Sequence, residues 1–262
     1  MKTKAHVLIA GAVPPELAGI EMILKKAAHR RVGVRRAVDG RLGNLPVRLL
    51  ETGPGILNAA MAITAAVQAA RPGLILMTGC AGAYAEAGLT VGDIALATAE
   101  IDAHLGVESL RNGNDLPEPL PFPVLKTSGA PVRNRYPLSA PWVDTAWRAL
   151  NGAFAGADFR LGRGPFVTVS TVTASRRRAR ALAGAYGGVM ETMEGAGAAH
   201  VALAYGIPWI HLRCASNRTG VRDYRHWRLD LACRRAALAA AAILTDTAVT
   251  ERLTRKPAEP SP

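Results

Sequence analysis

The stretch that decides the fold is Glu191-Thr-Met-Glu-Gly-Ala-Gly-Ala-Ala-His-Val-Ala-Leu-Ala-Tyr-Gly-Ile-Pro-Trp-Ile-His-Leu-Arg-Cys-Ala-Ser-Asn217. Residues 195–205 are small and apolar, which predicts a closely packed helix that begins after Glu194. A glycine and a proline end this helix, and residues 209–214 are typical of a buried strand that ends before Asn217. A carboxylate at a helix start is stabilised by the helix dipole, and a polar group after a strand lies where open α/β sheets bind ligands. The stretch therefore predicts that Glu194 and Asn217 share one crevice, although a capping glutamate and a loop asparagine would give the same pattern.

The rest of the chain alternates between apolar strands and helices. We expect strands over 6–10, 47–50, 74–77, 92–99 and 166–172, and helices from about 15 to 28, 56 to 70, 142 to 150, 175 to 186 and 229 to 244. This alternation predicts an α/β, three-layer fold with a mostly parallel central sheet. We predict a single domain over residues 1–256 and a disordered tail over residues 257–262.

Length and composition favour one sizeable α/β domain. The 262 residues are 49% hydrophobic and 5% aromatic, which is enough to build a core. The formal net charge of +12 is compatible with nucleic-acid binding. The arginines are spread along the chain, however, and the dense run at residues 176–180 contains no aromatic residue. We therefore interpret the charge as a solvated surface and expect no nucleic-acid partner.

The cysteines and the hydropathy pattern indicate a cytoplasmic protein. Cys80, Cys214 and Cys233 lack metal-site spacing and leave an odd cysteine, so we expect reduced thiols and no metal. The apolar run at residues 7–10 is too short for a signal peptide. No run of about 18 apolar residues is present, so we expect no membrane partner.

Four positions in the chain, Glu194 and Asn217 among them, carry candidate chemistry because each follows a predicted strand. They are Glu16, the pair Gly79-Cys80, Glu194 and Asn217. The ends of parallel strands meet at one edge of a sheet, so these residues are expected to converge on one site. Gly53-x-Gly55 suggests a dinucleotide fingerprint, but the third glycine and the distal acidic residue are missing, so this signal is weak.

These residues belong to motifs that resemble the purine nucleoside phosphorylase and nucleosidase superfamily. The motifs are Gly11-Ala-x-x-x-Glu16, Thr78-Gly-Cys-Ala-Gly82, Val91-Gly-Asp-Ile94, Met193-Glu-Gly-Ala196 and Arg213-Cys-Ala-Ser-Asn217. Within the superfamily, the chain looks most like the futalosine hydrolase family over residues 51–62, 102–108, 134–138 and 216–227. The last of these is the most telling, because the superfamily at large has an aspartate where this chain has Asn217.

The resemblance implies cleavage of the N-glycosidic bond of futalosine to hypoxanthine and dehypoxanthine futalosine, in menaquinone biosynthesis and without a cofactor. It implies that Glu194 binds the ribose hydroxyls, that Glu16 takes a proton from water, and that Asn217 donates both amide hydrogens to N7 and O6 of the base. The further substrate contacts that it implies are Gly79, Cys80, Ala81, Phe166, Thr173, Met193, Ser216, Arg218 and Arg222. Arg218, Arg222 and Arg135 are candidates for the substrate carboxylate, although an arginine in such a segment is more often a surface or structural residue.

Related phosphorylases carry an arginine and a serine where this chain has Met77 and Cys80. Neither residue provides a charge-assisted donor to phosphate, which favours water as the nucleophile. The alternatives are a methylthioadenosine/S-adenosylhomocysteine-type nucleosidase, a purine nucleoside phosphorylase and a nucleoside sensor without activity. The resemblance also implies a homo-oligomer, in which the proline-rich segment 116–124 packs on a partner's site.

Overall fold

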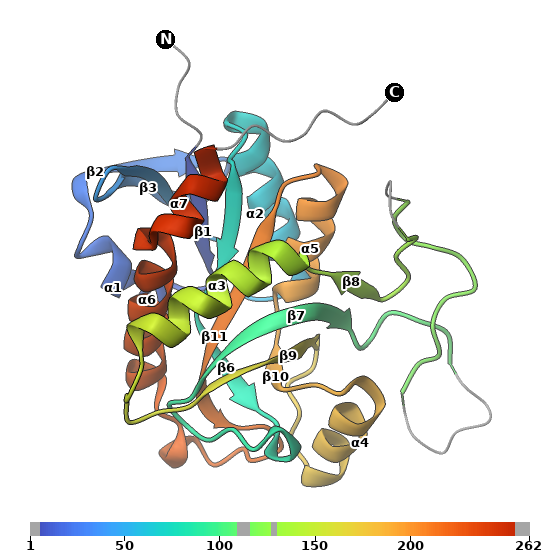
Figure 1. Cartoon of the computed structure of the whole chain (residues 1–262). Helices are drawn as coiled ribbons and strands as arrows, with labels where there is room; N and C mark the ends of the chain where they lie inside the picture. Colours follow the sequence, from blue (N-terminus) through green and yellow to red (C-terminus); the bar gives the residue numbers. More distant parts are fainter. Residues whose placement is uncertain (1–5, 109–115, 127–129, 255–262) are drawn as a thin grey trace.

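Strand β11 (Trp209–Arg218) joins the two parts of one eleven-stranded sheet (Figure 1). The computed structural model describes residues 6–108, 116–126 and 130–254. The predicted tail at 257–262 and the domain end at residue 256 lie outside these ranges. The first residues of β11 pair with one part of the sheet and its last residues with the other. This strand therefore positions side chains where the two parts meet.

The first part is an open sheet of parallel strands. Strand β1 (Val7–Gly11) lies between β4 (Leu45–Glu51) and β5 (Leu74–Met77), and β5 pairs with the start of β11. All of these pairings are parallel. β1, β5 and most of β11 are buried along their whole length, as expected for parallel strands that helices cover on both faces.

An antiparallel hairpin extends this open sheet and corrects one prediction. Helix α1 (Pro14–Glu21) ends seven residues before Ala28, where we predicted its end, and β2 (Lys25–Val32) and β3 (Arg35–Leu42) follow. β3 pairs antiparallel with both β2 and β4. The prediction of a helix to Ala28 was wrong because the sheet pairing of this edge strand outweighs the helical propensity of its Lys and Ala residues.

The second part of the sheet closes into a ring of five strands. From β11 the order is β6 (Cys80–Ala83), β10 (Met190–Thr192), β9 (Leu161–Thr168) and β7 (Ile94–Asp102), and β7 pairs back to β11. β8 (Arg135–Pro137) pairs with the last part of β7, on the edge opposite β9. Strand β6 was not among the predicted strands, and β9 begins about five residues earlier than predicted. Closure of the ring was not predicted.

Helices cover both faces of the sheet and confirm the predicted three-layer α/β class (Figure 1). On one face α6 (Leu229–Thr245) packs against α1, α3 (Ala140–Ala153) and α7 (Thr247–Thr254); on the other face α2 (Ile56–Ala69) packs against α5 (Gly195–Ala204). α4 (Arg176–Tyr186) packs on β9, and two short 3-10 turns cover Ala85–Ala87 and Tyr224–His226. None of the helices in the described ranges has the length and apolar character to cross a membrane.

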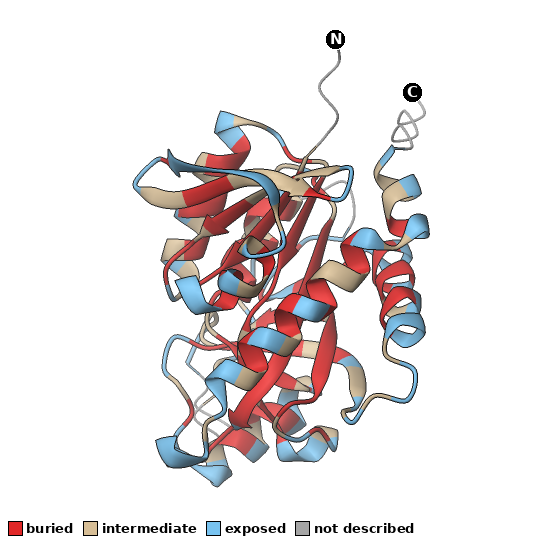
Figure 2. Ribbon diagram, turned by 90° about the vertical axis from the view of Figure 1, so that its left-hand side faces the viewer, coloured by how far each residue is buried: buried red, intermediate tan, exposed pale blue. Residues whose placement is uncertain are grey.

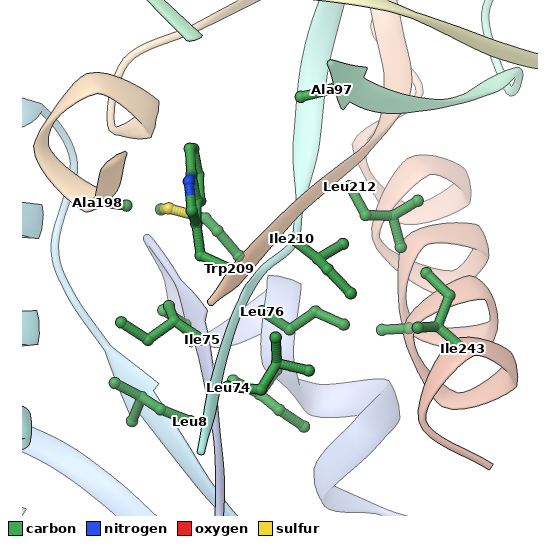
Figure 3. Packing of buried hydrophobic residues seen from close by; sticks show 14 of the residues in the cluster. Leu8, Leu74, Ile75, Leu76, Ala97, Ala198, Trp209, Ile210, Leu212 and Ile243 are labelled. Carbon is green, nitrogen blue, oxygen red and sulfur yellow. The ribbon is translucent and has the colours of Figure 1, made fainter. Parts of the chain in front are cut away.

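Side chains of β11 alternate between two layers of the core, which is buried throughout the sheet (Figure 2). Figure 3 shows Ile210 and Leu212 on the side of α6, with Ile243, and Trp209 on the side of α5, with Ala198. Because the period of a strand is two, His211 and Arg213 share the face of Trp209. The rings of Trp209 and His211 lie 5.8 Å apart. The alternation of side chains along β11 therefore directs His211 and Arg213 away from α6.

Candidate active site

One buried arginine connects the two carboxylates that the sequence predicts to be catalytic. Arg213 donates from Nη1 to Glu16 Oε1 at 3.2 Å and from Nη2 to Glu194 Oε2 at 2.9 Å. Glu16 comes from α1 and Glu194 is the N-cap of α5. Burial opposes the charge of Arg213, but the two carboxylates outweigh it and hold the pKa of the guanidinium above its usual value. With two carboxylates around one guanidinium, the group carries a formal charge of about −1.

Four donors hold Glu16 and fill its acceptor positions in this structure. Its Oε2 accepts from the backbone N of Ala12 at 2.6 Å and of Val13 at 3.4 Å, and its Oε1 accepts from Cys80 N at 2.8 Å as well as from Arg213. A carboxylate offers about four lone-pair sites. A water molecule can therefore bind Glu16 by displacing one donor, and Val13 N is the most distant of them.

Glu194 keeps acceptor capacity for a ligand. Its Oε1 accepts from Gly55 N at 3.0 Å and its Oε2 from Arg213 at 2.9 Å, so these two contacts use two of about four lone-pair sites. Its place at the start of α5 also agrees with the predicted helix start and with the stabilisation of a carboxylate by a helix N-terminus. The remaining positions suit two hydroxyl donors, such as the neighbouring hydroxyls of a sugar.

A second chain of hydrogen bonds fixes Arg213 from behind. Its Nε donates to His211 Nε2 at 2.9 Å, so this ring nitrogen is unprotonated, and His211 Nδ1 donates to Glu100 Oε2 at 2.7 Å. Glu100 also accepts from Thr168 Oγ1 at 2.5 Å. Burial lowers the pKa of His211 more than Glu100 raises it, which keeps the ring neutral. The guanidinium plane is therefore set by a neutral histidine and a buried carboxylate.

The predicted contacts Gly79, Cys80 and Ala81 support the site through their backbone. Gly79 has φ of 142°, and a Cβ there would lie 2.1 Å from Glu16 Oε1, so both conformation and space require glycine. The N–H of Cys80 is bound to Glu16. A hydrogen bond with Cys233, together with burial, raises the pKa of the Cys80 thiol, so this cysteine is neutral and is no nucleophile.

Asn217 lies within β11, whereas the sequence predicted a position just after the strand. Its Oδ1 accepts from Ser216 Oγ at 2.8 Å, and its Nδ2 donates to the backbone O of Arg218 at 3.2 Å. Ser216 Oγ also lies 3.2 Å from the backbone O of Ala81. An amide has two N–H groups, and one is used here. One hydrogen is thus left for a ligand in this conformation, instead of the two that we predicted.

The three other predicted contacts lie at different depths. Met193 is half-buried and adjoins Glu194 in the chain, which suits contact with a ligand. Phe166 is fully buried and packs edge-on against the His211 ring at 4.9 Å, so it lies behind the site and a direct substrate contact is not supported. Thr173 is also buried, and its backbone N donates at 3.0 Å to a carboxylate that sequence analysis did not assign, Glu191.

The three arginines predicted as candidates for the substrate carboxylate lie in different environments. Arg218 lines a cavity of about 490 Å³ together with Asn217, Arg176, His226 and Trp227. Arg222 instead stacks on the ring of Tyr224, with 5.2 Å between its guanidinium carbon and the ring centroid. Arg135 is exposed on β8. The structure therefore favours Arg218 over the other two for contact with a ligand beside Asn217.

Sequence analysis missed Arg213, His211 and Glu100 as parts of the site, although a signal was present. His211 and Arg213 stand two residues apart in an apolar strand, which places two polar side chains on one buried face. Glu100 is likewise a fully buried carboxylate between apolar residues of strand β7. Buried charged groups require partners, so this pattern predicts an internal ion network.

The chain matches the family model of the phosphorylase superfamily over residues 6–249. It belongs to this superfamily. The particular relatives include futalosine hydrolase from Thermus thermophilus, which is 36% identical over 75% of this chain and 80% of its own length. Futalosine hydrolase from Acidothermus cellulolyticus is also 36% identical, over 65% of this chain and 64% of its own.

Solved structures show the same fold at lower sequence identity. The 5′-methylthioadenosine/S-adenosylhomocysteine nucleosidase from Neisseria meningitidis, in complex with methylthio-immucillin-A, aligns with a TM-score of 0.77 and 21% identity. The alignment covers 92% of this chain and 98% of that one. The Helicobacter pylori nucleosidase aligns with a TM-score of 0.80 and 17% identity, over 93% and 99% of the two chains. These likenesses support the predicted nucleoside phosphorylase-like fold.

Proposed function

We propose that this chain hydrolyses the N-glycosidic bond of futalosine and releases hypoxanthine and dehypoxanthine futalosine, a step of menaquinone biosynthesis. The observation that carries the proposal is an anionic pair of carboxylates, Glu16 and Glu194, held by Arg213, together with a neutral amide, Asn217, on the same strand as Arg213. The first suits a cationic sugar and the second a 6-oxopurine. The similarity to two futalosine hydrolases supports the same substrate.

The sugar site stabilises the charge that develops when the bond breaks. Departure of the purine leaves positive charge on the ribosyl ring, and the group of Glu16, Glu194 and Arg213 has a formal charge of opposite sign. Glu194 binds the ribose hydroxyls through its two remaining acceptor positions. Met193, next to it in the chain and half-buried, packs against the ring.

Glu16 orients the attacking water and accepts its proton. The water displaces the long contact from Val13 N, since the other three donors lie at 3.2 Å or less. General-base assistance of this kind contributes about 10²- to 10⁴-fold. Arg213 holds both carboxylates at fixed positions, so no reorganisation is needed as the bond breaks.

The base and the sugar sites are spaced along β6. Cys80 N contacts Glu16, and two residues further on Gly82 faces Asn217, whose Nδ2 would lie 3.4 Å from a Cβ at that glycine. Two strand residues span roughly 7 Å, a distance comparable to that between a ribose and the far edge of its purine. Asn217 donates its free hydrogen to N7 or O6, where charge gathers on the leaving base. An ionised aspartate would repel O6.

Water is favoured over phosphate because the backbone donor nearest the site is already used. Cys80 N binds Glu16, and Met77 is fully buried in the core. Neither residue can provide the charge-assisted donor that a phosphate dianion requires. The substrate carboxylate binds Arg218, the predicted arginine that lines the cavity beside Asn217.

We also propose that the chain forms a homo-oligomer in the cytoplasm. Leu57 and Met61, one turn apart on α2, are 86% and 48% exposed, and Phe122 in the proline-rich segment 116–124 is 59% exposed. Exposed apolar side chains that adjoin each other, as Leu57 and Met61 do on one helix face, are typical of protein interfaces. Light scattering at micromolar concentration tests this, since an active monomer would contradict it.

The test of the function is incubation of the purified chain with futalosine, with and without phosphate, while hypoxanthine is followed by chromatography. We expect equal release in both buffers and a sugar product without phosphate by mass spectrometry. Glu194→Gln is expected to lower turnover by about 100-fold or more, whereas the exposed Glu86→Gln serves as a matched control. Release of adenine from methylthioadenosine, with no hypoxanthine from futalosine, would instead support the nucleosidase alternative, which short matches such as the Haemophilus ducreyi enzyme favour.

A further inference from the structure

A second buried carboxylate, Glu191, lies outside the network of the sugar site. It stands on β10, three residues before Glu194, and is 7% exposed. Its Oε1 accepts from Thr173 N at 3.0 Å and its Oε2 from the hydroxyl of Tyr84 at 3.1 Å. Both donors are neutral, and a buried carboxylate is costly unless its charge is compensated. The proposed hydrolysis gives Glu191 no role.

Strand register places Glu191 on the same face of the sheet as Asn217. Glu191 pairs with Gly82 across β10 and β6, and Asn217 pairs with Gly82 across β11 and β6. Paired residues direct their side chains to one face. Glu191 and Asn217 thus flank a glycine at two strand spacings, roughly 10 Å between backbones. The missing side chain at Gly82 lets polar side chains of β11 approach β6 closely, so that groups from both neighbouring strands face this glycine.

Two polar side chains of this region face Gly82, and one of them has no hydrogen-bond partner in the described part of the chain. A Cβ at Gly82 would lie 2.6 Å from Thr219 Oγ1 and 3.4 Å from Asn217 Nδ2, so both atoms face the glycine. Thr219 is 6% exposed, and its hydroxyl has no hydrogen-bond partner within residues 6–108, 116–126 and 130–254. A buried hydroxyl without a partner costs free energy unless a ligand completes its hydrogen bonding.

We propose that Glu191 is a second base-recognising residue, which accepts the N1–H of a 6-oxopurine while Asn217 donates to the neighbouring edge of the same ring. This inference rests on the proposed function and names the residue that determines its base preference. Thr173 N and Tyr84 use two of about four lone-pair sites of Glu191, so acceptor capacity remains.

The proposed pair distinguishes bases by hydrogen-bond polarity. A 6-oxopurine presents a donor at N1, which an ionised carboxylate accepts, whereas a 6-aminopurine presents a lone pair at N1, which the carboxylate repels. Burial raises the pKa of Glu191 against the hydrogen bonds from Thr173 and Tyr84 and the positive charge of Arg178. A bound N1–H is a further donor that favours the ionised form. The free N–H of Asn217 and one of the remaining acceptor positions of Glu191 then recognise two different polar positions of the base.

The test is the ratio of kcat/KM for futalosine to that for its 6-amino analogue in wild type and Glu191→Gln. Glutamine can accept from Thr173 N with its oxygen and donate to the Tyr84 oxygen with its nitrogen, so the variant is expected to fold. We expect futalosine cleavage to fall by about 10- to 100-fold, the scale of one hydrogen bond to a charged group. The ratio should shift toward the 6-amino substrate, because the amide can donate to N1.

Tyr84→Phe is the matched control, because it removes a partner of Glu191 and leaves the carboxylate. If Glu191 serves only to hold Tyr84, both variants will change activity on the two substrates equally, and the inference is overturned. Titration calorimetry with free hypoxanthine and adenine gives a second measure that needs no turnover: Glu191→Gln should weaken hypoxanthine binding and spare adenine. If the wild type binds hypoxanthine more tightly than adenine and Glu191→Gln removes this preference, but futalosine is not cleaved, the proposed function alone is overturned. Cleavage with an unchanged base ratio in Glu191→Gln would overturn this inference alone.

Discussion

Replacing Arg213 with methionine is expected to destabilise the fold by leaving two buried carboxylates without a partner. Four hydrogen bonds are lost: to His211 Nε2, Glu16 Oε1, Glu194 Oε2 and the backbone O of Cys80. Methionine retains most of the volume, so the cost is mainly electrostatic. Removing one partner of a buried ion pair costs about 3–5 kcal/mol. Since a domain is stabilised by about 5–15 kcal/mol, we expect Arg213→Met to fold but to lose a large fraction of its stability.

Urea denaturation at several pH values tests the electrostatic origin of this loss. Protonation of a buried carboxylate that has lost its partner removes an uncompensated charge, so low pH relieves this part of the destabilisation. The deficit of Arg213→Met should therefore shrink from pH 7.5 to about pH 5.

A double-mutant cycle with Glu16→Gln completes this test. In the wild type, the glutamine N–H group would face the donors of Ala12, Val13, Cys80 or Arg213, so Glu16→Gln is destabilising by itself. In Arg213→Met, the same change removes an unpaired charge. We expect a coupling free energy of about 2–3 kcal/mol. A loss below about 1 kcal/mol for Arg213→Met, or strict additivity of the two substitutions, would refute the reasoning.

Three further predictions follow from single positions. Gly79→Ala should abolish activity and lower the unfolding temperature, because its Cβ would overlap Glu16, whereas Gly152→Ala, with nothing within 4 Å, should be neutral or stabilising by calorimetry. Burial holds the pKa of His211 in the folded state below 6.5, so its contribution to stability is complete above pH 6.5 and is lost as pH falls through the folded pKa. In urea denaturation, His211→Gln should therefore lose less stability than the wild type between pH 6.5 and lower pH. An identical loss in both proteins would contradict the neutral state assigned to His211. Asn217→Asp should lose futalosine turnover by about 10- to 1000-fold and recover partly at low pH, and an unchanged pH–rate profile would remove Asn217 from the base site.

Much of the fold was predictable because residues with strong local preferences mark the ends of the helix and the strand around β11. Small residues, then a glycine and a proline, then an apolar run define α5 and β11, and both elements appear in the structure. The same local signals predict β1 and β5 to within a residue. The predicted pair of Glu16 and Glu194 also converges, because both lie at starts of helices that follow strands of one sheet.

The missed features depend on contacts that are distant in sequence. β6 is made of cysteine, alanine and glycine, which have little strand propensity, and it exists because β10 and β11 pair with it. The ring closes through a pairing of β7 with β11 that no local pattern encodes. The hydrogen bonds of Glu191 are likewise invisible in the sequence, because Thr173 and Tyr84 come from other segments.

The most direct test of the account is a comparison of two substrates with one enzyme preparation in phosphate-free buffer. The measured quantities are kcat/KM for hypoxanthine release from futalosine and for adenine release from methylthioadenosine. The neutral amide of Asn217 predicts that futalosine is preferred by about 100-fold or more, the scale of mispaired polar groups in a buried site. Equal or faster release of adenine would contradict the central claim that this site hydrolyses a 6-oxopurine nucleoside.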